Sequence, residues 1–246
     1  MVEIGVFYKC KSLKRVEFSE GLKRICDDAF FGSGLESVEF PTSLRAVSRG
    51  AFATCESLRT VVLNEGLEVL GVGQKTDEEQ PEGEVFFGSG IESVKIPSTL
   101  KVIEAKTFFK CESLKRVEFS EGLETIRSDA FLASGIEDVI LPSSVRVICG
   151  LAFAMCRHLR SVRLNEGLEV LGAGQRYRGD TCAGYVFVGS AIESLTVPAE
   201  VKRIERAALD KCETIKRIEF REGRETLGMG EEGSEIWNAL FRDCGV

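Results

Sequence analysis

The sequence contains the stretch Cys10-Lys-Ser-Leu13-Lys-Arg-Val16-Glu-Phe18-Ser-Glu-Gly21-Leu22 and repeats it, 101 residues later, as Cys111-Glu-Ser-Leu114-Lys-Arg-Val117-Glu-Phe119-Ser-Glu-Gly122-Leu123. Inside this long period lies a short one, whose first apolar position advances by 22, 23, 33 and 23 residues and then repeats these steps. That position is occupied in turn by Leu13, Leu35, Leu58, Ile91, Leu114, Ile136, Leu159, Ile192 and Ile215. Internal repetition of this kind indicates stacked coils. We therefore predict about ten coils of 22–23 residues, with an 11-residue insertion in coils four and eight.

Every coil carries the same sequence of apolar positions. An alternating pair such as Val16 and Phe18 predicts a short strand with one face directed inward. The strand ends at a turn that contains Gly in odd coils, as at Gly21, and Pro in even coils, as at Pro41. A second apolar pair follows, and then a segment that ends in Phe, as at Phe30. The length of this last segment predicts one helical or 3₁₀ turn that closes the coil.

A unit of 22 or 23 residues is too small to enclose a core of its own. When the units stack, their apolar positions form continuous stripes, and strands that enter in the same direction pair as a parallel sheet. No linker interrupts the pattern, which predicts one solenoid domain over residues 1–246. Its long repeats span residues 4–103 and 105–204, with a partial third over 206–246.

The pattern Cys-x-x-Leu-x-x-Val-x-Phe-x-x-x-Leu-x-x-Ile-x-x-x-Ala-Phe, which starts at Cys10 and recurs along nearly the whole chain, resembles the BspA-like (Treponema pallidum type) leucine-rich repeat. The resemblance implies an α/β leucine-rich-repeat solenoid: a curved, right-handed array with a parallel β-sheet on its concave face and short 3₁₀ or helical turns elsewhere. It also implies non-catalytic binding. Members similar to this chain occur in bacterial surface adhesins and in large protist families.

Composition and motifs argue against several other classes of protein. The formal net charge is −7 and the isoelectric point is near 5.1, which disfavours nucleic acid as a partner. No stretch approaches 18 apolar residues, so we expect no insertion into a membrane. The single histidine, His158, has no nucleophile placed beside it by spacing, and Gly228–Gly233 (G-x-G-x-x-G) matches the glycines that begin the insertions. We therefore predict no enzyme, no cofactor and no metal.

The cysteines follow the repeat. Five of them lie three residues before the Leu position of odd coils, Cys244 lies three after Phe241 in the same register, and even coils carry Ser there. This alternation predicts a buried ladder of thiol and hydroxyl groups that bond to turn backbone. Mostly unpaired thiols indicate a reducing compartment.

The outward positions of the predicted strands vary from coil to coil while the inward positions are nearly uniform. Solenoids use such extended faces to bind partners. The candidate partner-binding residues on this face are Arg15, Glu17, Glu39, Val62, Lys95, Arg116, Glu118, Ile140, Arg163, Arg217 and Glu219. The alternative is a solvated face whose ion pairs contribute little.

We predict a non-catalytic scaffold that binds another protein, of unknown identity, through the concave sheet face and the insertion loops. Two alternatives stay open: an extracellular adhesin module, and a structural subunit that associates end to end through its open coils. The segment Met1–Gly5 lacks the features of a signal peptide, which predicts an intracellular, most simply cytoplasmic, location. An extracellular location follows if the chain is a fragment of a longer secreted protein.

Overall fold

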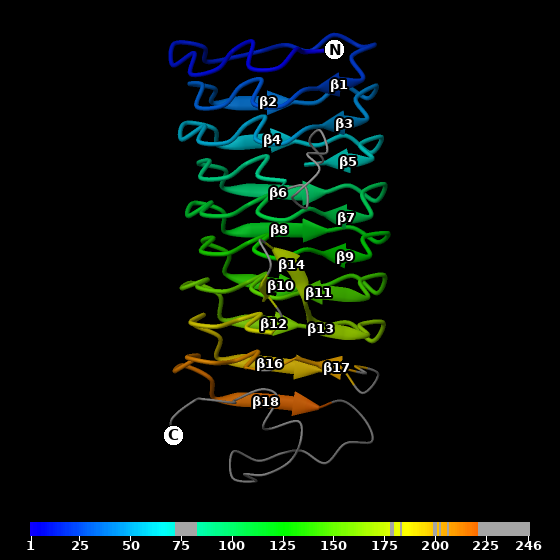
Figure 1. Ribbon diagram of the computed structural model, residues 1–246, viewed down its shortest axis with the longest axis vertical. Helices are drawn as coiled ribbons and strands as arrows, with labels where there is room; N and C mark the ends of the chain where they lie inside the picture. Colours follow the sequence, from blue (N-terminus) through cyan, green and yellow to red (C-terminus); the bar gives the residue numbers. More distant parts are fainter. Residues whose placement is uncertain are drawn as a thin grey trace.

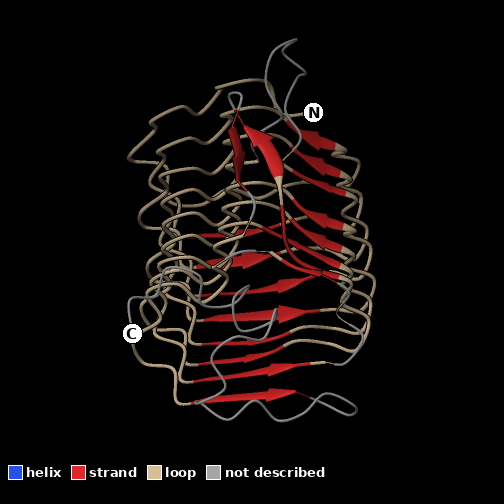
Figure 2. Cartoon of the chain, turned by 60° about the horizontal axis from the view of Figure 1, so that its bottom comes forward, coloured by secondary structure: helices blue, strands red, loops and turns tan. Residues whose placement is uncertain are grey.

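The computed structural model describes residues 1–71, 83–177, 180–182, 184–198, 201, 203–205 and 207–220. The chain winds through successive coils that stack along one axis, and most of the described coils contribute two short strands (Figure 1). The two strands of a coil run in opposite directions, so the stack carries two separate parallel sheets (Figures 1 and 2). We call them sheet 1 and sheet 2.

Sheet 1 contains the strands that the sequence predicted from the alternating apolar pairs. They pair coil to coil in parallel within two ladders, and a hydrogen bond from Glu137 N to Lys115 O at 3.1 Å joins the coils on either side of the break. The two ladders are β2 (Ser37–Glu39), β4 (Thr60–Val62), β6 (Ser93–Ile96) and β8 (Arg116–Phe119), then β10 (Asp138–Ile140), β12 (Ser161–Arg163), β16 (Ser194–Val197) and β18 (Arg217–Phe220). In the first coil, residues 13–18 form no strand.

Sheet 2 is built from shorter strands, which follow the Gly or Pro turn of each coil. They are β1 (Arg24–Ile25), β3 (Ala46–Val47), β5 (Val69–Leu70), β7 (Val102–Ile103), β9 (Thr125–Ile126), β11 (Val147–Cys149), β13 (Val170–Ala173) and β17 (Arg203–Ile204). Two further strands, β14 (Gln175–Tyr177) and β15 (Asp180–Cys182), form an antiparallel hairpin inside the second predicted insertion. The first predicted insertion, residues 72–82, lies outside the described residues.

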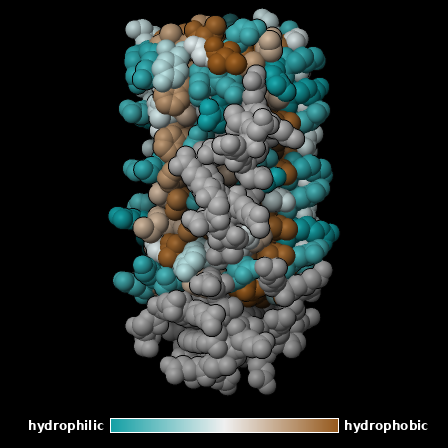
Figure 3. All heavy atoms as spheres, in the orientation of Figure 1, coloured by the Kyte–Doolittle hydropathy of each residue, from teal (hydrophilic) through white to brown (hydrophobic). Residues whose placement is uncertain are grey.

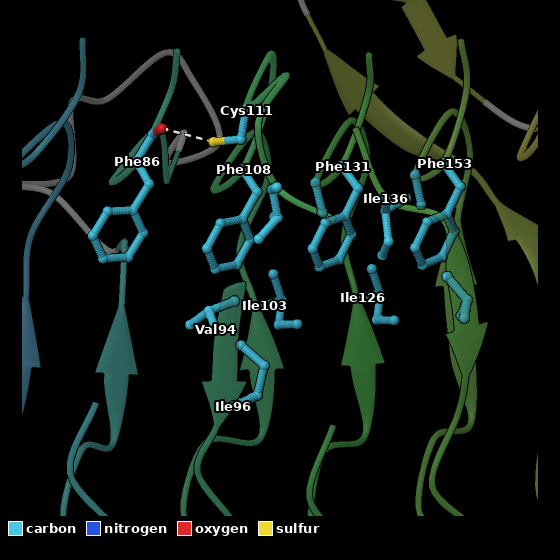
Figure 4. Packing of buried hydrophobic residues seen from close by; sticks show 14 of the residues in the cluster. Phe86, Val94, Ile96, Ile103, Phe108, Cys111, Ile126, Phe131, Ile136 and Phe153 are labelled. Carbon is cyan, nitrogen blue, oxygen red and sulfur yellow. Dashed lines mark hydrogen bonds between the residues drawn. The ribbon is translucent and has the colours of Figure 1, made fainter. Parts of the chain in front are cut away.

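A column of stacked phenylalanine rings forms the centre of the core (Figure 4). Phe131 lies between Phe108 and Phe153, with ring centroids 5.2 and 5.1 Å away and nearly parallel ring planes. Each of these rings is fully buried. The stack is continuous from Phe7 to Phe187, and Leu209 takes the place of the ring in the next coil. Aromatic pairs of this kind add stability beyond the area they bury.

The alternation of turn chemistry between odd and even coils has a direct structural reason. The carboxylate of Glu20, in an odd-coil Glu-Gly turn, accepts hydrogen bonds from Thr42 N and Ser43 N in the Pro turn of the next coil. Glu65 and Glu121 accept equivalent bonds from Ser98 N and Ser143 N. Each glutamate therefore satisfies backbone donors of the following turn, and the two turn types form one unit.

The prediction of helical or 3₁₀ turns was wrong for the described residues, which contain no helix of either kind. The backbone amides of these segments alternate between two kinds of acceptor. Phe108 N bonds to Ala130 O of the next coil at 2.8 Å, whereas Phe109 N bonds to Lys106 O and Cys111 N to Phe108 O within their own turns, both at 3.2 Å. The segments are instead pairs of tight turns. For these residues the designation α/β is replaced by an all-β solenoid, and no helix that could cross a membrane occurs among them.

Each pair of tight turns places residues in the left-handed region of backbone space. In one column of positions, Lys110, Ala133 and Met155 have φ values of 56°, 55° and 56°. Glycine occupies the same place in other coils, as at Gly88 with φ 60°. Left-handed φ costs an L-residue roughly 1–2 kcal/mol, and the bonds between coils offset that cost.

Paired glycines mark the base of both predicted insertions. A Cβ atom on Gly71 would lie 2.6 Å from Gly83 Cα, and one on Gly172 would lie 3.0 Å from Gly184 Cα. No side chain fits between backbones that approach so closely. The glycines that precede each insertion in the sequence therefore serve a close backbone contact.

The described residues confirm a leucine-rich-repeat solenoid with parallel sheets. They do not confirm the total of about ten coils or the insertions as predicted, and the partial third repeat lies mostly beyond them. The right hand, the curvature and the concavity of the sheet face stay predictions.

Candidate functional site, the outer face of sheet 1

All eleven predicted partner-binding residues lie on the outward side of sheet 1 or of the aligned segment in the first coil. Ten are exposed and Glu219 is half-buried. The inward neighbours, such as Val38, Val94 and Val139, are buried in the core, so the alternation predicted for each strand is confirmed. That these residues bind a partner stays a prediction.

Parallel register aligns these side chains into two rows that cross the strands. Lys95 of β6 lies beside Glu118 of β8, Ile140 of β10 lies beside Arg163 of β12, and Glu39 of β2 lies beside Val62 of β4. Residues from distant parts of the sequence thereby share one surface. Sequence reasoning placed them correctly because the repeat fixes their register.

Two hollows lie in this surface. The larger has a volume of about 800 Å³ and reaches from Thr60 and Val62 across β6 and β8 to Asp138 and Ile140. The second, of about 540 Å³, extends from Arg15 to Thr60 and Val62. Because both hollows touch Val62 and Thr60, together they form a long trough over the first six coils of sheet 1.

Most charged groups in the row beside sheet 1 are paired within the chain, and Lys115 and Glu137 are the members of the row whose side chains make no ion pair in the described structure. One row alternates basic and acidic residues from coil to coil, and its ion pairs include Lys14 with Glu36 at 3.4 Å and Arg59 with Glu92 at 3.7 Å. Glu193 contacts both Arg160 and Lys216, at 3.5 and 2.8 Å. Seven of the nine charged residues in this flanking row are therefore ion-paired within the chain.

The charges on the outer face itself are mostly unpaired. Lys95 Nζ lies 3.5 Å from Glu118, and Arg217 pairs with Glu219 in the same strand. Within the described part of the chain, the side chains of the other charged candidates make no ion pair or hydrogen bond: Arg15, Glu17, Glu39, Arg116 and Arg163. The outer face therefore presents charged groups that are available to a partner.

An apolar stripe along one edge of the stack was not identified from the sequence as a surface. Figure 3 shows hydrophobic side chains in a column just inside its left margin. The residue after the core phenylalanine is exposed or half-buried in several coils, as at Tyr8, Phe87 and Phe109, and buried in others, as at Ala53 and Ala154. Tyr8 stacks on Phe31 at 5.0 Å and Phe87 lies 5.3 Å from Phe109. A hollow of about 500 Å³ lies on this edge, between Phe109 and Met155. In the sequence, the consecutive pairs Phe30-Phe31, Phe86-Phe87 and Phe108-Phe109 indicate a second aromatic side chain directly after the core ring.

One ion pair is largely buried on the side of sheet 2. Arg127 Nε lies 2.9 Å from Glu104 Oε2, with 10% of the Glu104 side chain exposed. Burial raises the pKa of Glu104, and the Arg127 charge opposes that rise. The pair stands at the base of the first predicted insertion, since the Glu104 Cβ approaches Gly71 and Gly83. Its position indicates a structural role.

The residues with the most reactive chemistry are dispersed. His158 is exposed, and within the described ranges no three His, Cys, Asp or Glu side chains gather as they would around a metal ion. The glycine motif Gly228–Gly233 and the side chain of Cys182 lie outside the described residues. Among the described cysteines, Cys10, Cys26, Cys55, Cys111, Cys149 and Cys156 form no disulfide.

Comparison with known proteins agrees with this geometry. The sequence profile of the BspA type leucine rich repeat region matches residues 1–74, 82–175 and 180–230, in six copies. No curated protein matches the chain.

Solved structures similar to the chain are also leucine-rich-repeat proteins. A protein from Bacteroides ovatus is 20% identical with a TM-score of 0.66, over 89% of this chain and 58% of its own length. The Treponema pallidum protein TpLRR is 20% identical with a TM-score of 0.47, over 75% and 69%. A leucine rich cell surface protein from Faecalibacterium prausnitzii is 20% identical with a TM-score of 0.37, over 98% and 79%.

The chain thus spans little more than half the length of the Bacteroides ovatus protein, and at this identity the likeness supports the fold alone. The profile match is the stronger result, because it covers most of the sequence and follows the same repeated positions that build the two sheets. The chain belongs to the BspA type leucine-rich repeat family.

Proposed function

We propose that the chain is a non-catalytic scaffold that binds another protein through the outer face of sheet 1. The observation that carries the proposal is the contrast between two sets of charges: seven of the nine charged residues in the row beside the sheet are ion-paired, whereas five of the nine charged candidates on its outer face make no ion pair in the described structure. Unpaired charges around a trough provide specificity for a complementary surface. The apolar side chains of Val62 and Ile140 supply area that a partner can bury.

A photo-crosslinking experiment tests this proposal. Benzoylphenylalanine is placed at Arg116 or Arg163 on the outer face, and at Lys101 beside sheet 2 as the matched control, since all three side chains are exposed. The purified chains are irradiated in an extract of the native source, and adducts are identified by mass spectrometry. We expect one protein to be captured from Arg116 and Arg163 and not from Lys101. Equal capture at all three positions would reject the face as the binding site.

Charge reversal gives a second measurement on the captured partner. Arg116→Glu is expected to weaken binding by about tenfold or more and to change its salt dependence, because the arginine is unpaired in the free chain. Lys14→Glu is the control, since Lys14 already pairs with Glu36 beside the sheet.

The proposed location is the reducing interior of a cell, and it is supported by six described cysteines that form no disulfide: Cys10, Cys26, Cys55, Cys111, Cys149 and Cys156. Titration of thiols on protein purified from its native source tests the location. A full count of free thiols agrees with a reducing compartment, whereas oxidised cysteines would favour the extracellular alternative.

A second candidate function, end-to-end association of the solenoid, is favoured by the first coil. Met1, Ile4, Val6 and Tyr8 are 69%, 59%, 52% and 47% exposed, and Phe7 stacks on one ring only, that of Phe30. Apolar surface of this kind is typical of contact sites. Light scattering across a concentration series distinguishes a monomer from an associating species, and Ile4→Ser with Val6→Ser is expected to abolish association.

A further inference from the structure

The trough on sheet 1 contains two exposed apolar side chains at a defined separation. Val62 of β4 is 46% exposed and Ile140 of β10 is 62% exposed, and among the described residues of this face they are the exposed large apolar ones. Both line the hollow of about 800 Å³, one near each end. They occupy equivalent positions of the repeat, two residues after Thr60 and Asp138, and β6 and β8 lie between their strands.

The separation of the two side chains follows from the sheet. Three strand spacings of roughly 4.8 Å place them about 14 Å apart along the stack axis. In an extended peptide, side chains at i and i+4 share one face and lie about 13–14 Å apart. A helix brings side chains to one face at about 5, 10 and 16 Å. The spacing therefore fits an extended segment that runs along the axis and across the strands.

The polar groups between the two apolar side chains define the middle of the segment. Lys95 and Glu118 lie side by side in the same row and form an ion pair at 3.5 Å. The side chain at i+2 of an extended segment points at this pair. A charged residue there would be repelled by one partner of the pair, whereas a hydroxyl or carboxamide accepts from Lys95 and donates to Glu118.

We propose that sheet 1 binds an extended peptide segment of its protein partner, with apolar side chains at i and i+4 and an uncharged polar side chain at i+2. The i and i+4 side chains contact Val62 and Ile140, and the i+2 side chain hydrogen-bonds to the Lys95 and Glu118 pair. This inference rests on the proposed function and adds the kind of partner that the face recognises.

A peptide series tests the spacing on the full chain of 246 residues. Fluorescently labelled Ser/Thr/Gln host peptides carry two Ile residues at i and i+2, i+3, i+4, i+5 or i+7, and their binding is measured by anisotropy. We expect the i+4 peptide to bind about tenfold more tightly than the i+3 and i+7 peptides, since only one Ile at a time reaches an apolar contact in the others. Lys or Glu at i+2 is expected to weaken the i+4 peptide.

Two variants that keep a β-branched side chain show where the peptide binds. Val62→Thr and Ile140→Thr retain β-branched side chains at exposed strand positions, so the fold is preserved, and each is expected to weaken the i+4 peptide by about tenfold. Met155→Gln changes an equally exposed apolar residue outside the trough and is the matched control.

Several results would overturn the proposal. The proposal is wrong if no peptide binds, if all spacings bind equally, or if the i+7 peptide binds most tightly. It is also wrong if Val62→Thr and Ile140→Thr leave the binding of the i+4 peptide unchanged. Crosslinking from Arg116 separates this proposal from the proposed function. If Arg116 captures a partner while the peptides do not bind, the face is a binding site but its partner presents a different structure.

Discussion

The thiol of Cys111 donates a hydrogen bond to the backbone carbonyl oxygen of Phe86, 3.0 Å away in the preceding coil (Figure 4). The same bond recurs from Cys156 to Phe131 and from Cys212 to Phe187. Serine of the intervening coil completes the ladder, with Ser89 Oγ lying 3.5 Å from Cys111 Sγ. The repeated cysteines therefore satisfy buried backbone oxygens.

The first prediction concerns thiol reactivity. Burial raises the pKa of Cys111 and of Cys156 to about 12, so almost no thiolate is present at neutral pH. Cys10 occupies the same register but is exposed in the first coil. Because the thiolate is the nucleophile, we expect iodoacetamide to modify Cys10 in the native chain, and Cys111 and Cys156 only after denaturation. Peptide mapping by mass spectrometry measures this order, and equal rates in the native chain would contradict it.

The second prediction compares two rings of the phenylalanine column. Phe131 is fully buried between two rings, so Phe131→Ala is expected to cost about 3–5 kcal/mol in the free energy of unfolding. Phe7 is half-buried and stacks on Phe30 alone, so Phe7→Ala is expected to cost roughly half as much. Urea unfolding followed by circular dichroism checks both values. Equal losses would show that the end coil is packed as tightly as the interior.

The fold was predictable because the repeat determines both register and burial. Once Val38, Val61 and Val94 are recognised as one column, their inward direction and the outward direction of Glu39 and Lys95 follow. The turn after each strand was predicted from Gly and Pro, but the hydrogen bond that Thr42 N donates to the Glu20 carboxylate was not, since it joins two coils.

The closing segment could not be predicted by the same reasoning. An Ala-Phe pair is compatible with a helical turn, and only the stacked neighbour reveals that Phe108 N donates to Ala130 O. Hydrogen bonds between coils alternate with local bonds that close single turns, and non-glycine residues at left-handed φ accompany them. The pairing of charges beside sheet 1 also needs the three-dimensional register. Without that register, the unpaired charges of the outer face cannot be distinguished from the paired charges beside it.

The third prediction uses the column of left-handed residues. Gly88 has φ 60°, and a Cβ atom there meets nothing closer than Thr54 Cγ2 at 3.9 Å. Gly88→Ala is therefore expected to destabilise the fold by about 1 kcal/mol through backbone strain alone. Ala133 has φ 55° at the same position of its coil, so Ala133→Gly removes strain and is expected to raise stability or leave it unchanged. Thermal unfolding of both variants measures the difference, and a loss for Ala133→Gly as large as that for Gly88→Ala would contradict the account.

The last prediction concerns acid stability. Hydrogen bonds from backbone amides of the next turn lower the pKa of Glu20, Glu65 and Glu121 below the ordinary value of 4.5, with Thr42, Ser98 and Ser143 as the principal donors. A carboxyl group whose folded-state pKa is depressed contributes stability that is fully present above its unfolded value and is lost as the pH falls through the folded value. These three turns therefore weaken together below about pH 4.5.

Replacing all three with glutamine isolates this contribution. The variant Glu20→Gln, Glu65→Gln, Glu121→Gln is expected to be less stable than the natural chain at pH 7 and to lose less of its melting temperature between pH 6 and pH 3. The matched control is Glu112→Gln, Glu137→Gln, Glu213→Gln, which removes the same charge from carboxylates that make no hydrogen bond or ion pair in the described structure. If both triple variants flatten the pH dependence equally, general charge repulsion rather than the bonds between turns governs unfolding by acid.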